Sequence, residues 1–382
     1  MTFVYDALVI GAGYIGVSVA YHFSKAGLRT ALLDRGGVGS GASRANYGNI
    51  QVQDAELAHS LDLIQAGYAS FEGLEAELGQ PVGLRQLGSL LLIENEAQWQ
   101  MMAARLPRLH TAGIRAELVE ASHLPDLEPL LDVSALLGAC YHQREGQIYP
   151  FALLSAFLNA GQKRGLSLHW RTEVNAIITR ADRVTGVRTS RGDFSAGVVA
   201  LCTGAWTTKL GRMVERNWPV RHVIGQALIT EAAPTLRLRN HLASAAFFQE
   251  AHGGGQDGGT ERAILAFSQT REGHFLLGEA ARVTCDMDIR ATPTGQPAIA
   301  RLAARFLPAL QKLQVLRGWA AAVAFTYDGL PLLGPVAGLK GLILATAFKS
   351  TVIVTPLVGR LVTELALTGC TQLDITPFSP DR

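Results

Sequence analysis

Val4-Tyr5-Asp6-Ala7-Leu8-Val9-Ile10-Gly11-Ala12-Gly13-Tyr14-Ile15-Gly16 is the stretch that decides the fold of this chain of 382 residues. The residues up to Ile10 are β-prone and mostly apolar, as in a buried parallel strand. The residues that follow place three glycines at the spacing GxGxxG, which is typical of a loop that binds phosphate groups. The stretch therefore predicts a strand that runs into a glycine-rich loop.

A helix and a second strand follow this loop. Ile15, Val19 and Phe23 recur every four residues and predict a helix with one buried stripe, which ends at Gly27. Residues 30–33 are apolar and predict the second strand. A strand, a helix and a parallel strand in this order predict the beginning of a doubly wound α/β sheet.

Each glycine of the loop has its own physical task. Gly11 permits the tight turn out of the strand, Gly13 lets the backbone approach a pyrophosphate, and Gly16 lets the helix pack closely on the strand. The helix N-terminus offers free N–H groups and a positive dipole end to the phosphates. Asp34 follows the second strand and can accept hydrogen bonds from a ribose diol. Its negative charge would repel the 2′-phosphate of NADP, so NADP is disfavoured. The motif by itself does not distinguish an NAD site from an FAD site.

The composition excludes several other classes of protein. The 34 basic and 32 acidic residues leave a net charge of +2, which gives no electrostatic reason to expect a nucleic acid partner. The ten histidines show no HxH or HExxH spacing and the four cysteines form no CxxC pair, so we expect no metal site and a reducing compartment. No signal peptide is recognisable, and no apolar run reaches the roughly 18 residues that span a bilayer. We therefore expect no transmembrane segment and a cytoplasmic location, with peripheral attachment at the inner membrane left open.

The rest of the chain is predicted as alternating helices and strands. We expect helices over 55–78, 98–110, 296–306 and from Pro150 onward. We expect strands over 87–93, 135–141, 166–178, 184–189, 193–201, 315–325 and 342–345, and a strand-rich pattern over 220–277. Thr355-Pro356 is predicted as the N-cap and first residue of a last helix, which ends at Gly369.

Five landmarks occur in order along the chain. They are the first strand–helix–strand unit with Gly39-Ser40-Gly41-Ala42-Ser43, Gly146-Gln147-Ile148-Tyr149-Pro150, Cys202-Thr203-Gly204-Ala205-Trp206, Trp319 with Asp328-Gly329-Leu330-Pro331-Leu332-Leu333-Gly334, and Gly341-Leu342-Ile343-Leu344-Ala345. With them the chain resembles the FAD-dependent D-amino-acid oxidase and glycine oxidase superfamily, the DAO family, over essentially its whole length. The resemblance implies an α/β fold of the glycine oxidase type, with a discontinuous Rossmann-type FAD-binding domain (1–84, 144–216 and 326–382) and an inserted β-rich substrate-binding domain (85–143 and 217–325).

The resemblance also implies a noncovalently bound FAD. Sarcosine oxidase-like members attach flavin to a cysteine in the stretch that matches residues 320–325, and this chain has none there. In this family the last helix points its N-terminus at the flavin ring, where its positive end would stabilise the reduced anionic flavin. The residues expected to bind FAD are Gly11, Gly13, Tyr14, Ile15, Gly16, Asp34, Arg35, Ser43, Arg44, Asn46, Val174, Thr203, Gly204, Trp206, Asp328, Phe348, Lys349, Ser350 and Thr351.

Two departures from the family pattern bear on the substrate. Glycine oxidase-like members have a carboxylate-binding arginine where this chain has Val323, which argues against a simple amino-acid pocket. Phe348-Lys349-Ser350-Thr351 is more similar to the branch that contains opine oxidase B subunits, D-hydroxyproline dehydrogenase and hydrogen cyanide synthase. That branch implies oxidation of a C–N bond to an imine that water hydrolyses. It also implies partner subunits, often with iron–sulfur clusters.

Four residues are candidates for the catalytic site. Lys349 precedes the last helix and aligns with a position that serves the substrate carboxylate in glycine oxidase-like members; a solvated lysine is the alternative. Arg44 lies on the loop after the second strand, where turn hydrogen bonds are the alternative. Tyr327 either faces the pocket or packs in the core or an interface. His274 lies in the predicted substrate domain, where a position in a hairpin turn is the favoured alternative.

The leading hypothesis is an FAD-dependent dehydrogenase that oxidises the C–N bond of an amino-acid-derived secondary amine such as an opine or an imino acid. In this hypothesis the chain is the catalytic subunit of a multisubunit enzyme. The alternatives are a flavin-carrying electron-transfer or assembly subunit without its own substrate, a stand-alone D-amino-acid or glycine oxidase, and an NAD-dependent dehydrogenase with the same loop.

Overall fold

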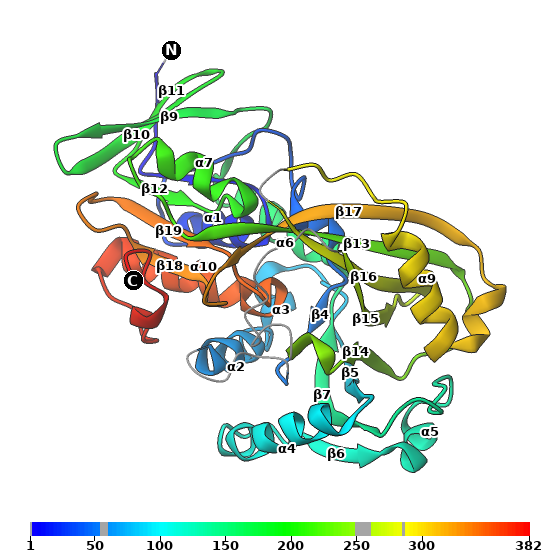
Figure 1. Ribbon diagram of the computed structural model, residues 1–382. Coiled ribbons are helices and arrows are strands. Elements are labelled where there is room, and N and C mark those ends of the chain that lie inside the picture. Colours follow the sequence, from blue (N-terminus) through cyan, green and yellow to red (C-terminus); the bar gives the residue numbers. More distant parts are fainter. Residues whose placement is uncertain (1, 54–59, 249–260, 285–286) are drawn as a thin grey trace.

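A six-stranded sheet in the order β18-β19-β12-β2-β3-β8 forms the centre of one half of the molecule. The computed structural model describes residues 2–53, 60–248, 261–284 and 287–382 (Figure 1). The strands of this sheet are β2 (Ala7–Ile10), β3 (Thr30–Leu33), β8 (Ser167–His169), β12 (Val198–Leu201), β18 (Leu332–Pro335) and β19 (Leu342–Thr346). All neighbours are parallel except β18, which is antiparallel to β19. Both β2 and β3 are buried at every residue, as apolar strands in a covered parallel sheet should be.

Helices cover one face of this sheet and a small sheet lies against the other. Helix α1 (Tyr14–Lys25) packs against α6 (Pro150–Gln162) and α10 (Thr351–Thr368), and α10 packs against α2 (Leu61–Ala69). Their apolar side chains form one buried cluster. Apolar side chains of the small sheet form a second buried cluster together with side chains of the six-stranded sheet. The small sheet has four strands: β1 (Thr2–Val4), β11 (Gly192–Ser195), β10 (Arg183–Thr189) and β9 (Val174–Arg180).

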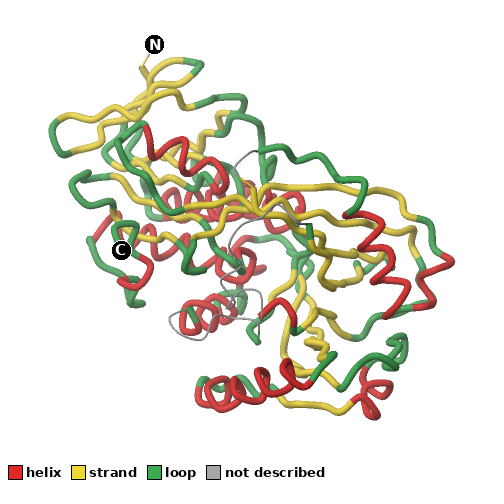
Figure 2. Tube along the Cα trace, in the orientation of Figure 1, coloured by secondary structure: helices red, strands yellow, loops and turns green. Residues whose placement is uncertain are grey.

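A nine-stranded sheet forms the other half of the molecule. Its strands are β4 (Asn49–Ile50), β5 (Arg85–Ile93), β6 (Glu117–Glu120), β7 (Gly138–Gln147), β13 (Val220–Ala232), β14 (Asn240–Ser244), β15 (Arg262–Gln269), β16 (His274–Thr284) and β17 (Val315–Thr326). The long strands β13 and β17 extend from the half that contains the six-stranded sheet into this half, and α9 (Gly295–Phe306) packs against β13, β15 and β16 (Figures 1 and 2). The predicted domain division remains a proposal.

The remaining helical segments of the described chain lie between these elements. They are α3 (Leu74–Leu78), α4 (Glu96–Thr111), α5 (Leu124–Leu127), α7 (Thr207–Arg212), η1 (Ala42–Ala45), η2 (Ala121–His123), η3 (Gly204–Trp206), η4 (Pro308–Lys312) and η5 (Thr376–Phe378).

The α/β fold is confirmed, and a strand from late in the chain joins the first sheet. Several segments that were predicted as one element, however, form two elements in the structure. The predicted strand 193–201 forms β11 and β12, which belong to different sheets because the chain crosses between the sheets at residues 196–197. The predicted strand 166–178 likewise forms β8 and β9. Within the predicted helix 55–78, α2 and α3 are separated by Gly73, whose φ is +72°. Residues 55–59 of that prediction lie outside the described residues.

The predicted start of the last helix was wrong. Helix α10 begins at Thr351, and Pro356 lies inside it at the sixth position. The hydroxyl of Thr355 donates to the carbonyl oxygen of Thr351 at 2.8 Å, so it does not cap the helix. Proline within a helix removes one backbone hydrogen bond, and the surrounding packing compensates for that loss. The earlier start moves the positive helix end next to Phe348.

The expectation about long apolar segments also needs a correction. Among the described residues, α10 is the helix that is long and apolar enough to cross a membrane by length and composition. Most of it, 61% of the window, is buried inside the protein against α1 and α2. A helix in the core of a protein can be as long and as apolar as a membrane-spanning helix. The packing of α10 against α1 and α2 makes it such a core helix.

Candidate cofactor and substrate site

A cavity of about 1350 Å³ lies where the two halves of the molecule meet. On one side it is lined by residues at the carboxyl ends of β2, β3 and β12. On the other side it is lined by residues of β13, β15, β16 and β17. Ligands of open α/β sheets bind at the carboxyl ends of the strands, so this cavity is the candidate site.

The glycine loop has the close contacts that its three tasks require. The φ of Gly11 is +103°, and a side chain there would overlap the carbonyl oxygen of Cys202. A Cβ on Gly16 would overlap the carbonyl oxygen of Gly11, so only glycine lets α1 pack this closely on the turn. A Cβ on Gly13 would lie 2.9 Å from the hydroxyl of Ser43. Gly13 and Ser43 both line the cavity, and the absence of a side chain at Gly13 leaves room for the Ser43 hydroxyl beside the loop.

Asp34 connects the glycine loop to the turn after β3. Its carboxylate accepts hydrogen bonds from the backbone N–H groups of Ala12, at 2.8 Å, and Gly36, at 2.7 Å. Carboxylate oxygens can accept more than one hydrogen bond each, so Asp34 can still receive a ribose hydroxyl. The first N–H groups of α1 have no acceptor within the helix, which suits them to phosphate oxygens.

A flat aromatic surface lies beside Asp34. The guanidinium of Arg35 stacks over the ring of Trp206 at 4.4 Å from its centre, and both residues line the cavity. Such a pair can support the flat face of a base. The glycine loop, the acid, the aromatic surface and the size of the cavity together fit a dinucleotide.

The beginning of α10 lies at the same cavity. Ala347, at φ +59°, turns the chain just before the helix. The ammonium of Lys349 lies 4.9 Å from the ring centre of Phe247 and 5.5 Å from that of Phe248. The side chain of Lys349 is half-buried and lines the cavity, so the positive end of α10 and this cation act on the same space.

The wall opposite the helix is one face of the nine-stranded sheet. Arg221, Val223 and Gly225 alternate along β13 and all line the cavity. Val323 of β17 pairs with Val223, and Phe325 pairs with Arg221. The middle of this wall, where Val323 lies, is therefore apolar.

Two polar residues that the sequence analysis did not select, Tyr47 and Glu279, line the cavity close to this wall. Tyr47 follows η1, and Glu279 lies on β16. Burial raises the pKa of the Glu279 carboxyl above its ordinary value. Burial and then the nearby Glu279 raise the pKa of the Tyr47 hydroxyl well above its ordinary range. The lone acid in the otherwise apolar stretch Phe275–Ala281 is the signal that could have identified Glu279.

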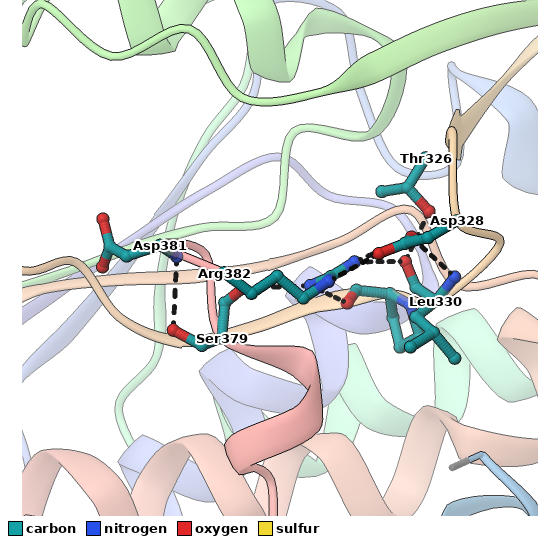
Figure 3. A network of polar contacts seen from close by, with 7 residues as sticks. Thr326, Asp328, Leu330, Ser379, Asp381 and Arg382 are labelled. Atoms are coloured by element: carbon teal, nitrogen blue, oxygen red, sulfur yellow. Dashed lines mark hydrogen bonds and ion pairs between the residues drawn. The ribbon is translucent and has the colours of Figure 1, made fainter. Parts of the chain in front are cut away.

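Asp328 is held by the C-terminal residue of the chain. The guanidinium of Arg382 donates to its carboxylate at 2.7 and 3.0 Å, and the N–H of Leu330 donates at 3.1 Å (Figure 3). Partial burial opposes ionisation, but these hydrogen bonds leave the pKa of Asp328 below its ordinary value. Asp328 therefore fixes the loop that borders the cavity before β18.

Most predicted site residues meet at this cavity. The predicted residues that line it are Gly11, Gly13, Tyr14, Ile15, Asp34, Arg35, Ser43, Asn46, Val174, Thr203, Gly204, Trp206, Tyr327, Asp328, Phe348, Lys349, Ser350 and Thr351. Gly16 lies behind this surface, against Gly11.

Arg44 and His274 do not line the cavity. Arg44 is exposed on η1. His274 begins β16 in the hairpin with β15, and its Nδ1 lies 2.9 Å from the carbonyl oxygen of Thr230. Five strand residues, or roughly 16 Å, separate it from Glu279. His274 thus lies at the hairpin end of β16, and the strand leads from there toward the cavity.

The chain is similar to known flavoproteins over its whole length. The family model described as FAD dependent oxidoreductase, DAO, matches residues 6–365. Glycine oxidase of Geobacillus kaustophilus is 27% identical over 100% of this chain and 98% of that protein. Hydrogen cyanide synthase subunit HcnC of Pseudomonas aeruginosa is 27% identical over 99% of this chain and 96% of that protein.

Solved structures show the same fold. The crystal structure of glycine oxidase from Geobacillus kaustophilus superposes with a TM-score of 0.89 at 26% identity, over 100% of this chain and 99% of that chain. L-proline dehydrogenase from P. horikoshii has a TM-score of 0.86 at 23% identity, over 100% of this chain and 98% of that chain, and supports the fold alone.

Proposed function

The chain belongs to the DAO family of FAD-dependent oxidoreductases, and on that premise we propose that it oxidises the C–N bond of an amino-acid-derived secondary amine such as an opine or an imino acid. FAD is the cofactor of this family, and when bound it supplies the two-electron acceptor. One observation carries the proposal: a single cavity joins the glycine loop to a sheet face lined by both charged and apolar side chains. A dinucleotide and a small substrate therefore fit side by side.

Lys349 and the N-terminus of α10 are suited to hold a substrate carboxylate. Both place positive charge at the cavity, and the rings of Phe247 and Phe248 reduce the access of water to the Lys349 ammonium. A charge in such a partly desolvated place attracts a carboxylate more strongly than one on the surface. This anchor would position the carbon that loses the hydride.

The apolar side chain of Val323 supports a substrate whose nitrogen carries a second carbon substituent, in place of a simple amino acid. The wall pair Val223–Val323 is apolar and can receive the second carbon substituent of a secondary amine. Such an amine would lose a hydride from carbon and a proton from nitrogen, and water would then split the imine. An opine would yield an amino acid and a 2-oxo acid.

We further propose that the protein is the catalytic subunit of a multisubunit dehydrogenase that passes electrons to partner subunits, some with iron–sulfur clusters. The similarity to HcnC, which is named as a subunit, supports this arrangement. The proposed location is cytoplasmic, including the inner face of the membrane for the assembled complex. A stand-alone amino-acid or glycine oxidase is the second candidate, because the similarity to glycine oxidase extends over the full length of both chains.

Anaerobic reduction of the bound flavin tests the proposal. The holoenzyme, purified with any partners that accompany it, would be mixed with opines, D-hydroxyproline, sarcosine, glycine and D-alanine. We expect the visible flavin band to bleach with secondary amines, and an artificial dye to reoxidise the protein faster than oxygen does. Fast reoxidation by oxygen would favour the stand-alone oxidase. Bleaching by dithionite but by no amine would favour a subunit that only transfers electrons.

A further inference from the structure

We propose that Glu279 recognises the cationic nitrogen of the substrate, so that the site takes an amine that enters as an ammonium ion. The inference rests on the proposed function and deepens it, because it assigns the group that binds the substrate nitrogen. It follows from the pairing of the carboxylates around the cavity, from the space in front of Glu279 and from the position of Tyr47.

Four carboxylates line the cavity, and three of them are engaged. Asp34 accepts hydrogen bonds from the glycine loop. Glu173 pairs with Lys209 at 2.7 Å, and Asp328 pairs with Arg382 at 2.7 Å. Glu279 has neither a hydrogen bond nor an ion pair with any residue of the described chain. It is therefore the lining acid that remains available to a bound cation.

The wall leaves room for a ligand in front of Glu279. Its Oε2 lies 3.4 Å from where a side chain on Gly225 would begin, so the carboxylate reaches across the sheet toward β13. Gly225 pairs with Ala281 on one side and Ala321 on the other. These two neighbours of Gly225 are small, and the next residue in this row is Arg262, which pairs with Ala281 and also lines the cavity.

Tyr47 adds a second polar group to the same place. A side chain on Gly278 would overlap the Tyr47 hydroxyl, so this hydroxyl lies directly against the backbone next to Glu279. The ring of Tyr47 packs edge-on against Trp319 at 6.4 Å between ring centres. A phenol oxygen and a carboxylate side by side offer acceptors for the N–H groups of one ammonium.

Three arginines, Arg221, Arg262 and Arg282, line the wall that carries Glu279, and none of them is a cause of a lowered pKa at Glu279. Arg221 is four residues from Gly225 along β13, or roughly 13 Å, with its guanidinium 5.6 Å from the centre of the Tyr327 ring. Burial is the cause that raises the pKa of Glu279, and no neighbouring cation opposes it. An ammonium group in the substrate would supply the missing positive charge and favour the ionised carboxylate.

Ligand pairs that differ only in the charge of one group test the proposal. Iminodiacetate and sarcosine carry an ammonium centre, and thiodiacetate and (methylthio)acetate carry sulfur in its place. Affinities would be measured by calorimetry under anaerobic conditions with holoenzyme whose flavin has first been reduced by dithionite, so that no amine can be oxidised. A charge-assisted hydrogen bond gives about tenfold or more in affinity, so we expect wild type to prefer the ammonium member of at least one pair by that factor.

The variant Glu279→Gln should remove this preference while it keeps FAD and the thermal midpoint of unfolding. Glu272→Gln, in the turn of the same hairpin and outside the cavity lining, removes an equal charge and should leave the preference as in wild type. A wild type without preference in every pair, or a preference that survives Glu279→Gln, would overturn the assignment. Because binding is read without turnover, this result is separate from whether any amine reduces the flavin.

Discussion

The hydroxyl of Tyr47 occupies the space in which a side chain on Gly278 would begin. Two segments far apart in the sequence, the loop after η1 and strand β16, thus meet in direct contact at the substrate end of the cavity. The contact requires glycine at position 278, and it places the tyrosine beside Glu279.

Replacement of Gly278 by alanine should displace Tyr47 and lower turnover. The added methyl group overlaps the hydroxyl, so the ring must move. We expect the FAD content to stay near that of wild type and kcat/KM with the best amine substrate to fall by about tenfold or more, the cost of a misplaced polar group. In a Tyr47→Ala background the same substitution should have little further effect. Equal losses in both backgrounds would show that the two residues act independently.

Gly16→Ala should prevent FAD binding. The methyl group would overlap the carbonyl oxygen of Gly11, and α1 would have to move away from the loop that receives the pyrophosphate. Gly37→Ala is the matched control, because a Cβ at Gly37 meets no atom within 4 Å. The ratio of flavin to protein absorbance after purification measures the result. Normal flavin content in Gly16→Ala would contradict the assigned role of this glycine.

Lys349→Met should keep FAD but weaken the capture of substrate. The substitution retains most of the apolar stem against Phe247 and removes the charge. Loss of a charge-assisted contact predicts a decrease in kcat/KM on the order of 10- to 100-fold. Lys340→Met removes a surface ion pair with Asp182 and should leave the kinetics unchanged. If the two variants behave alike, Lys349 is a solvated lysine.

Acidification should destabilise the protein through two buried histidines. Burial lowers the pKa of both His22 and His241 to about 4, below the value of 6.5 that applies to the unfolded chain. Because the unfolded chain binds these protons first, each histidine decreases the free energy of unfolding by about 1.4 kcal/mol per pH unit as the pH falls from 6.5 toward 4. Above pH 6.5 both histidines are neutral in the folded and in the unfolded chain, so this destabilisation is absent there.

Urea unfolding at about pH 7, 6 and 5 measures this effect. His241→Gln can replace part of the contacts with Ser268 and Gly146 and lacks the titrating ring. We expect the unfolding free energy of this variant to fall less steeply with acid than that of wild type. Parallel curves would indicate that His241 does not titrate in this range.

Local sequence patterns were sufficient to predict the nucleotide-binding end. The apolar strand, the glycine spacing, the helix stripe and Asp34 lie within 34 consecutive residues, and each follows from steric demands on neighbouring residues. The order of five landmarks then identified the family. Local patterns misplaced the start of α10, because tertiary packing allows Pro356 inside that helix.

The sequence by itself therefore predicted a dinucleotide site at the glycine loop and determined that the fold is a doubly wound α/β sheet. Only the tertiary structure decided which residues form the substrate end. Tyr47, Glu279 and Val323 come from three distant segments and line the same cavity. The pairing of β13 with β16 and β17 brings Glu279 and Val323 to one wall, and Tyr47 comes from the loop after η1. Strand register assigns each side chain to one face, so the same pairing that brings Glu279 to the cavity keeps His274 at the far end of its hairpin.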